Sequence, residues 1–190
     1  EGSLVKQGYL RIAGVDEAGR GALAGPVVAA AVILPFRCEI TGLTDSKQLT
    51  SAQREAFFSQ IERDAVRVGI GIVDHQIIDQ INILQATKLA MQKAIESIIP
   101  PPDYVLVDGN QLPLVQMPGQ SVIKGDSLVQ SIAAASVMAK VTRDRIMIAF
   151  DVDYPDFGFK KHKGYGTPRH RQAIVDLDPC PIHRTSFKLT

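Results

Sequence analysis

This sequence of 190 residues has two cysteines, no long apolar run, a net charge close to zero and no tryptophan. Cys38 and Cys180 lie far apart and show no CxxC spacing, so thiolate metal sites and redox motifs are disfavoured. No run of about 18 apolar residues is present, and residues 1–7 lack the basic, apolar and small-residue order of a signal peptide. We therefore expect a cytoplasmic protein with reduced cysteines and no membrane association.

The charges nearly balance, with 21 basic and 20 acidic residues and a formal net charge of +1. A surface for nucleic acid would therefore depend on segregated charge, with acids in one place and Lys and Arg around it. Apolar residues make up 45% and charged residues 22% of the chain, as in ordinary globular enzymes. A chain of this length can bury roughly 70% of its unfolded surface, so we predict one domain over residues 1–190, and we expect a monomer.

Short apolar runs bounded by Gly and Pro are typical of buried strands, whereas apolar residues at three- and four-residue intervals are typical of helices. Residues 155–168 are rich in Gly, Lys and aromatic residues without a clear period, which predicts an exposed functional loop or linker. The order of elements predicts an α/β fold, a mixed sheet with helices on both faces. The predicted strands are residues 10–15, 25–34, 66–73, 104–107 and 121–123, and the predicted helices begin at Thr50 and cover residues 83–99 and 127–150.

Two of the predicted strands end on acidic side chains. Asp16 and Glu17 follow the first apolar strand, and Asp108 follows the fourth. Carboxyl ends of parallel strands meet at the ligand-binding edge of an α/β sheet. Neighbouring side chains of a strand point to opposite faces, so Asp16 and Glu17 can share a site only if the strand ends near Asp16. Asp126, just before the longest predicted helix, could be held against the same edge.

Carboxylates gathered at one point repel one another unless a cation lies among them. Oxygen ligands without His or Cys favour Mg²⁺ or Mn²⁺, and two such ions can activate water and stabilise the leaving oxygen in phosphodiester cleavage. Taken singly, each acid is more often a turn, cap or solvated residue. Their joint placement nevertheless predicts a divalent-metal-dependent nuclease with catalytic, metal-binding Asp16, Glu17, Asp108 and Asp126.

Seven short motifs, in this order along nearly the whole chain, give it a resemblance to the bacterial ribonuclease HII family. Any one of them could arise by chance, but their number and order make accidental similarity unconvincing. They are GVDEAGRG (residues 14–21), DSK (45–47), VDG (107–109), KGD (124–126), AAAS (133–136), AKVTRD (139–144) and HKGYGT (162–167).

The resemblance implies a ribonuclease H-like fold with a C-terminal helical and loop segment, about residues 155–190, that binds substrate. It implies hydrolysis of the RNA strand of RNA/DNA hybrids and nicking 5′ of ribonucleotides embedded in duplex DNA, with two Mn²⁺ or Mg²⁺ ions, leaving 3′-hydroxyl and 5′-phosphate ends. The same four acids fall on the family's metal-binding positions. The substrate-binding residues that it implies are Gly19, Arg20 and Gly21, which would read the 2′-hydroxyl through main-chain groups, together with Lys47 and Tyr165.

Two further groups of residues keep more than one interpretation. Asp144 matches an additional acid of the family, but a salt bridge to Arg143 or Lys140 is an equal alternative. The four histidines show no ligand spacing, and we expect surface or core roles for them, with His162 nearest the predicted site. Candidate phosphate contacts are Lys47, Lys124, Lys140, Arg143, Lys161 and Lys163.

Two competing functions are consistent with parts of the pattern. A hybrid-binding protein could use the acids only to stabilise a turn, and it would bind without metal and form no product. A nucleotide-binding module is the weaker alternative, because the Gly19-Arg20-Gly21 stretch lacks the third glycine of a GxGxxG motif and follows two anions. The chain also departs from many relatives of the family at Ala22, where they have proline after the two glycines.

Overall fold

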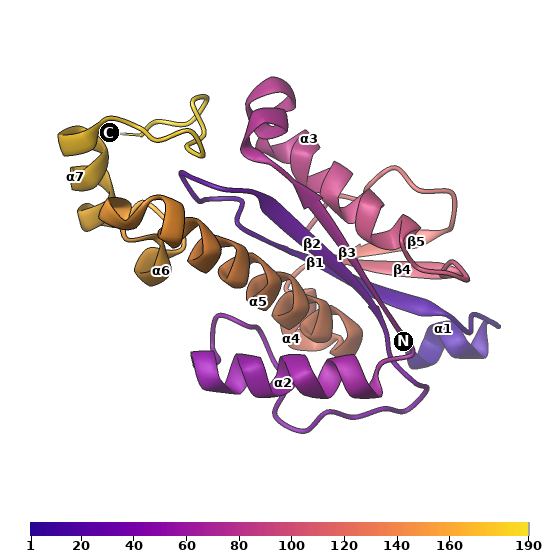
Figure 1. Ribbon diagram of the computed structural model, residues 1–190. Coiled ribbons are helices and arrows are strands. Elements are labelled where there is room, and N and C mark those ends of the chain that lie inside the picture. Colours follow the sequence, from indigo (N-terminus) through magenta and orange to yellow (C-terminus); the bar gives the residue numbers. More distant parts are fainter. Residues whose placement is uncertain (190) are drawn as a thin grey trace.

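A mixed five-stranded sheet in the order β3-β2-β1-β4-β5 forms the centre of the computed structural model, which describes residues 1–189 (Figure 1). β1 pairs with β2 and β2 with β3 in antiparallel fashion, whereas β1 pairs with β4 and β4 with β5 in parallel. The α/β class and the mixed sheet predicted from the sequence are therefore confirmed. The strands are β1 (Ile12–Ala18), β2 (Val27–Ile33), β3 (Arg67–Val73), β4 (Tyr104–Asp108) and β5 (Gly119–Val122).

Helices cover both faces of this sheet, with α3 (His75–Glu96) on one side and α5 (Gln130–Asp153) and α2 (Ser51–Asp64) on the other (Figure 1). β2 reads VVAAAVI and is buried along its whole length, because side chains of both its faces lie under a helix. One apolar cluster joins the sheet to α3, and a second joins it to α5 and α2. The sheet is thus fixed from both sides, which gives the ends of its strands a rigid frame.

The helix boundaries agree with the prediction at one helix and differ at two. Thr50 caps α2 and forms a capping box with Gln53, as its position before the helical pattern predicts. α3 begins eight residues earlier than predicted, at His75, and is broken at Asn82, which has φ 66°. The long helix predicted from residue 127 is divided into α4 (Gly125–Leu128) and α5, because Val129 is extended.

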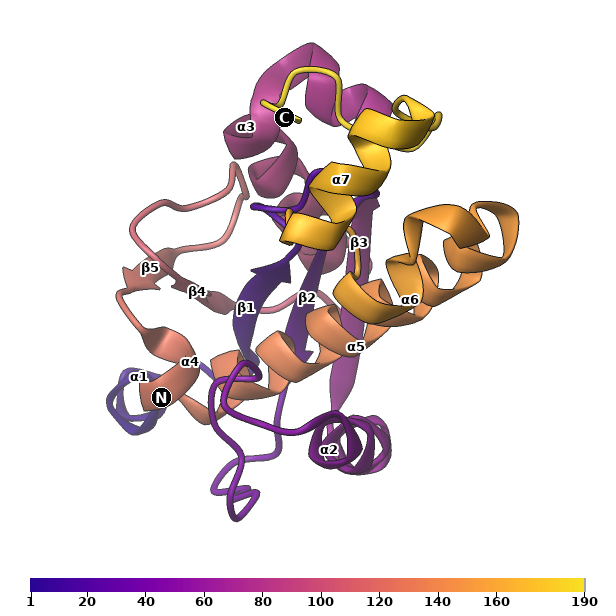
Figure 2. The same cartoon turned by 90° about the vertical axis from the view of Figure 1, so that its left-hand side faces the viewer.

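The C-terminal segment is more ordered than predicted. Residues 155–168 contain the 3-10 turn η1 (Pro155–Phe157) and α6 (Phe159–His162) in place of a simple exposed loop. The prediction was wrong because the aromatic side chains of Phe157 and Phe159 are buried in a third apolar cluster with α7 (Pro168–Leu177). This segment packs beside the end of α5 and the connection between β1 and β2 (Figure 2).

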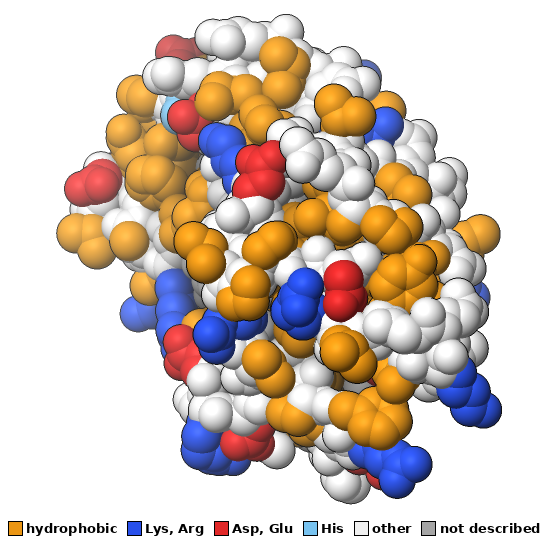
Figure 3. Space-filling model, turned by 90° about the vertical axis from the view of Figure 1, so that its right-hand side faces the viewer, with side chains coloured by type: hydrophobic (Ala, Val, Ile, Leu, Met, Phe, Trp, Pro, Cys, Tyr) orange, Lys and Arg blue, Asp and Glu red, His pale blue; other side chains and the backbone are white. Residues whose placement is uncertain are grey.

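The side of the molecule opposite to the view of Figure 2 carries hydrophobic side chains interspersed with charged side chains of both signs (Figure 3). The short helix α1 (Gly2–Lys6), which the sequence patterns did not predict, packs beside β1 and β4 through Leu4. Within residues 1–189 no helix combines the length and the apolar character that a membrane crossing needs.

Candidate active site

The parallel pair β1 and β4 brings the predicted acids to one end of the sheet. Val15 lies opposite Val107 in the ladder, so Asp16 and Asp108 follow on neighbouring strands. The expectation that β1 ends near Asp16 is wrong, because pairing with β2 continues to Ala18. Asp16 therefore points to the α5 face, on the side of Ser136, and Glu17 points toward α3.

Each acid has its own hydrogen-bond partner. The Asp16 carboxylate accepts a bond from the Glu17 N–H at 2.7 Å, and the Asp108 carboxylate accepts one from the Gly125 N–H at 2.7 Å. The second bond ties the end of β4 to the helix that carries Asp126. Glu17 forms an ion pair with Arg20, with 3.2 Å between Oε1 and Nη1.

The acids are close enough to perturb one another electrostatically. Burial raises the pKa of Asp16 well above its usual value, and the charges of Glu17 and Asp108 raise it further. Burial raises the pKa of Asp126 too, with added effects from Asp108 and Asp45. Burial is also the main cause that raises the pKa of Glu17. Negative charge at this end of the sheet is therefore unfavourable without a nearby cation.

Lys47 supplies part of the missing positive charge. Burial alone would lower the pKa of its ammonium group, but the carboxylates of Asp45, Asp16, Asp126 and Asp108 raise it above its ordinary value. One cation facing several acids shows that these side chains share an electrostatic environment. Lys47 neutralises only part of that charge.

Within residues 1–189, no three Asp, Glu, His or Cys side chains stand close enough together to hold a metal ion as they are oriented. Asp16 and Glu17 lie on opposite faces of β1, and Glu17 turns to Arg20. The donor set nevertheless consists of carboxylate oxygens, which suits Mg²⁺ or Mn²⁺ and no thiolate-seeking metal. The metal-binding roles of Asp16, Glu17, Asp108 and Asp126 stay a prediction that requires their side chains to turn toward one ion.

The five residues that the resemblance implies for substrate binding lie around one pocket. This pocket has a volume of about 420 Å³ and lies at the end of β1, between the β1–β2 connection, the loop before α2, and α5. Its floor includes Ser46 and Ser136, whose hydroxyl groups are hydrogen-bonded at 2.9 Å. Glu17 also reaches the pocket, next to Gly19, Arg20, Gly21, Lys47 and Tyr165.

The structure corrects the interpretation of one side chain of α5 and agrees with one interpretation of another. Arg143, a candidate phosphate contact, is fully buried and donates only to main-chain carbonyl groups, so that role is wrong. Its position in a helix pattern rich in small residues did not reveal this burial. Asp144 forms an ion pair with Lys140 at 2.8 Å, which is one of the two interpretations left open.

Three of the four histidines form a cluster in the C-terminal segment, which the sequence patterns did not predict. The rings of His162 and His170 stack at 4.2 Å, and the Nε2 atoms of His170 and His183 are 3.1 Å apart. Phe159 packs against all three rings. The expected core or surface role of these histidines is confirmed, and the spacing of aromatic residues around Phe159 was the available signal.

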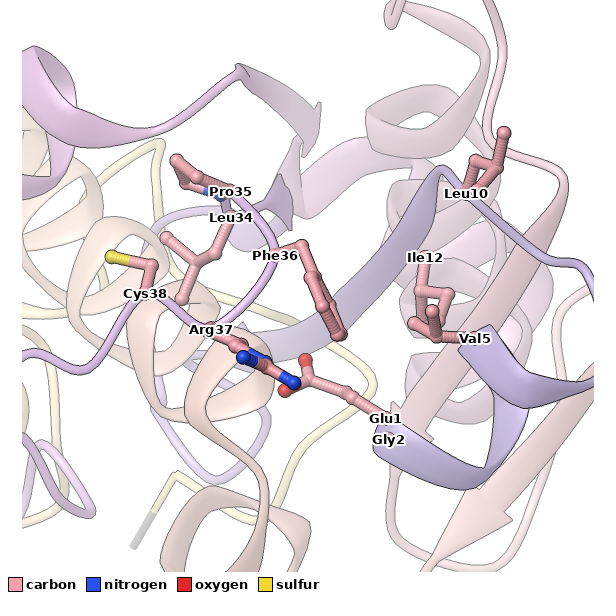
Figure 4. Close-up of a pocket in the computed structure, with 10 residues that line it drawn as sticks. All are labelled: Glu1, Gly2, Val5, Leu10, Ile12, Leu34, Pro35, Phe36, Arg37 and Cys38. Atoms are coloured by element: carbon pink, nitrogen blue, oxygen red, sulfur yellow. The ribbon is translucent and has the colours of Figure 1, made fainter.

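A second cavity, of about 200 Å³, lies at the amino end of β1, far along the strand from the acids (Figure 4). It is lined mainly by apolar side chains such as Leu10, Ile12 and Phe36, with Glu1 as its single acid. This cavity lacks the carboxylate pairs that perturb one another at the carboxyl end. The candidate site is therefore the end of β1 that carries Asp16.

Comparison with known proteins identifies the family. A family model described as ribonuclease HII matches residues 13–190. The curated ribonuclease HII of Geobacter sulfurreducens is 55% identical over 99% of this chain and 87% of its own length. That of Listeria monocytogenes is 52% identical over 98% of this chain and 71% of its own length.

Solved structures of similar fold support the same family. Ribonuclease H2 from Pyrococcus horikoshii superposes with a TM-score of 0.80 at 28% identity, and 94% of each chain is covered. Ribonuclease HII from Archaeoglobus fulgidus, solved in a complex with PCNA, gives a TM-score of 0.76 at 27% identity over 95% of this chain and 96% of its own. Since the family model and the relatives span the chain nearly from end to end, the protein belongs to the ribonuclease HII family and is an endoribonuclease of the ribonuclease H type.

Proposed function

We propose that the protein hydrolyses the RNA strand of RNA/DNA hybrids and nicks duplex DNA on the 5′ side of an embedded ribonucleotide, leaving 3′-hydroxyl and 5′-phosphate ends. The observation that supports this proposal is the placement of mutually perturbing carboxylates beside a pocket lined by Gly19, Arg20, Gly21 and Tyr165. The protein acts as a cytoplasmic monomer that removes RNA from DNA during replication and repair. Residues 155–190 form its C-terminal substrate-binding segment.

The acids hold two divalent ions, Mg²⁺ or Mn²⁺, in this proposal. When bound, the ions supply an activated water and neutralise charge at the leaving oxygen. Asp16 and Asp108 lie on adjacent strands and provide the rigid part of the site, whereas Asp126 approaches from α4. Glu17 must leave its ion pair with Arg20 to join them. The raised pKa values of Asp16 and Asp126 support a cation here, because a cation favours the charged carboxylates.

Recognition of the ribonucleotide depends on main-chain groups. Gly19 has φ +99° and Gly21 has open space where a side chain would be, so the backbone can approach a sugar closely. The 2′-hydroxyl is both donor and acceptor and distinguishes RNA from DNA. The Tyr165 ring lines the same pocket, where it packs on the neighbouring sugar in this proposal, and Lys47 contacts phosphate.

Incubation of the protein and Mg²⁺ with a labelled duplex that contains one ribonucleotide tests the proposed function. We expect a single nick 5′ of the ribonucleotide, no nick in the all-DNA duplex and no product in excess EDTA. Equal nicking of both duplexes would refute the ribonucleotide recognition. Binding without product at any Mg²⁺ or Mn²⁺ concentration would instead indicate a hybrid-binding protein.

The Asp16→Asn variant tests the role of the acids. We expect it to lose cleavage by at least a hundredfold while its affinity for the duplex stays within about twofold, because a neutral amide removes a metal ligand and keeps the shape. Glu62→Gln, on the exposed surface of α2, is the matched control and should cleave normally. Retained cleavage in Asp16→Asn would remove this residue from the site.

A further inference from the structure

Two fully buried arginines meet behind the connection between β1 and β2. Arg143 comes from α5 and Arg184 from the C-terminal segment, and neither side chain is exposed to solvent. Arg143 donates hydrogen bonds to the carbonyl oxygens of Pro26 and Ala24 at 2.9 and 3.1 Å. Arg184 donates to those of Gly25, Arg20 and Pro26 at 3.0, 3.0 and 3.1 Å.

Neither guanidinium has a carboxylate partner within residues 1–189, which is unusual for a buried charge. Burial, and after it the charge of Arg143, lower the pKa of Arg184 to about 9. Two like charges so placed oppose folding, and a neutral side chain could fill the same space at lower cost. What a neutral side chain lacks is the planar fork of donors that holds several carbonyl oxygens at once.

Each of these carbonyl groups belongs to a peptide bond, so its direction also fixes the direction of the N–H group of that peptide bond. In a trans peptide the C=O of one residue and the N–H of the next point in opposite directions. The Arg20 carbonyl points inward to Arg184, so the Gly21 N–H points away from the arginines, toward solvent. Gly21 is exposed, and its N–H donates no backbone hydrogen bond inside the described part of the chain. Arg184 thereby presents this N–H to the pocket.

Arg143 connects the same loop to Tyr165. It fills the space beside Gly19 that a side chain at that position would occupy, and it donates to the Lys163 carbonyl at 2.9 Å. Its guanidinium lies 5.2 Å from the centre of the Tyr165 ring, and Tyr165 also forms an isolated bridge with Ala22. The Arg143 side chain therefore lies against both Gly19 and the Tyr165 ring, which line the same pocket.

We propose that Arg143 and Arg184 are positioning residues that fix the Gly19–Gly21 main chain and the Tyr165 ring at the spacing which selects a ribonucleotide. They touch neither substrate nor metal, and they act through the carbonyl groups that they hold. The effect on ribonucleotide selectivity rests on the proposed function. The order of the Gly19–Gly21 main chain does not rest on it, because this order is a property of the protein without substrate.

The variants Arg184→Lys and Arg143→Lys test the proposal, because lysine keeps a basic side chain of similar length and loses the planar fork of donors. Ile174→Ala is the control, since Ile174 is buried in the C-terminal cluster and its apolar side chain donates no hydrogen bond to the carbonyl groups. Affinities for a duplex with one ribonucleotide and for the all-DNA duplex are measured by fluorescence anisotropy in EDTA. The values of kcat and KM are measured with Mg²⁺.

We expect each lysine variant to lose at least fivefold of the affinity preference for the ribonucleotide, with KM raised more than kcat is lowered. The control should be less stable and should keep the preference. Lysine variants that keep the preference would overturn the proposal. A basic side chain of similar size would then be enough for the preference, without the planar fork of donors. A control that loses it equally would also overturn the proposal, because general destabilisation would explain the loss.

Loop order is measured separately by NMR on the free protein. We expect the order parameters of the backbone amides of residues 19–22 to fall from about 0.85 to below about 0.6 in the lysine variants and to stay high in the control. If the wild-type protein neither nicks nor prefers the ribonucleotide, the proposed function fails, and this measurement still decides whether the arginines fix the loop. Unchanged order parameters in both lysine variants would overturn the positioning role.

Discussion

A fall in pH from 7.5 to 5 is expected to destabilise the protein through His170. This ring is fully buried, and burial lowers its pKa from 6.5 to about 4. Its Nδ1 lies 3.0 Å from the Tyr165 carbonyl oxygen, which only accepts, so Nδ1 carries the hydrogen. Its Nε2 lies 3.1 Å from the Nε2 of His183, whose Nδ1 lies 3.1 Å from the Cys180 carbonyl oxygen. Protonation of His170 would place a charge inside this buried cluster, where Phe159 packs against the ring.

The sign and size of the effect follow from the two pKa values. The unfolded chain binds a proton at His170 near pH 6.5, and the folded protein binds it only near pH 4. The contribution of His170 to the free energy of unfolding is therefore fully present above pH 6.5 and is lost as the pH falls toward 4. The loss is about 2 kcal/mol at pH 5 and about 3 kcal/mol below pH 4. Burial also lowers the pKa of His183, which adds in the same direction.

Urea unfolding followed by circular dichroism at pH 7.5, 6.5, 5.5 and 5 measures the effect in the wild-type protein and in His170→Gln. The variant is less stable at every pH, but its loss between pH 7.5 and 5 should be smaller by about 2 kcal/mol. Acids with raised pKa values, such as Asp16, act in the opposite direction and cancel in this comparison. His75→Gln, at the start of α3, should lose as much as the wild type. Equal losses in wild type and His170→Gln would refute the reasoning.

Three other substitutions test the packing and capping of the fold by urea unfolding at neutral pH. Thr50→Ala removes the capping box with Gln53 and should destabilise by about 1 kcal/mol, whereas an unchanged midpoint would show that the cap contributes nothing. Ser131→Ala should stabilise by up to about 1 kcal/mol, because the buried Ser131 hydroxyl has no hydrogen-bond partner within residues 1–189; a loss of stability would reveal a partner. Gly71→Ala should destabilise by at least about 2 kcal/mol, since its methyl group would overlap the Ala90 carbonyl; a smaller loss would mean that α3 shifts freely.

The sheet could be predicted from the sequence because its strands carry a strong local signal. The run VVAAAVI of β2 is apolar throughout and is buried on both faces. The acids at the ends of β1 and β4 can meet at one edge if these strands are parallel neighbours, and the structure fulfils this condition. The first turns of α3 escaped prediction because residues 75–82 mix polar and apolar side chains, and Asn82 interrupts their period.

The site was predicted from residue types, and its three-dimensional details were not. The sequence placed Asp16 and Glu17 together, but it could not show that β1 continues to Ala18 and separates them onto two faces. The burial of Arg143 and Arg184 was not predicted, because an isolated arginine usually lies on a solvated surface. Their burial depends on carbonyl groups more than 100 residues away, which no local pattern records.

The link between Arg184 and the Arg20 carbonyl spans 164 residues and has a consequence for biosynthesis. On the ribosome, the sheet and α5 are complete once Asp153 has emerged. Arg184, which holds the carbonyl groups of Arg20, Gly25 and Pro26, follows about thirty residues later. A nascent chain can therefore acquire its core while the Arg20 and Gly25 carbonyl groups still lack their arginine partner, so the main chain around the two glycines is secured only after the sheet and α5 have been synthesised.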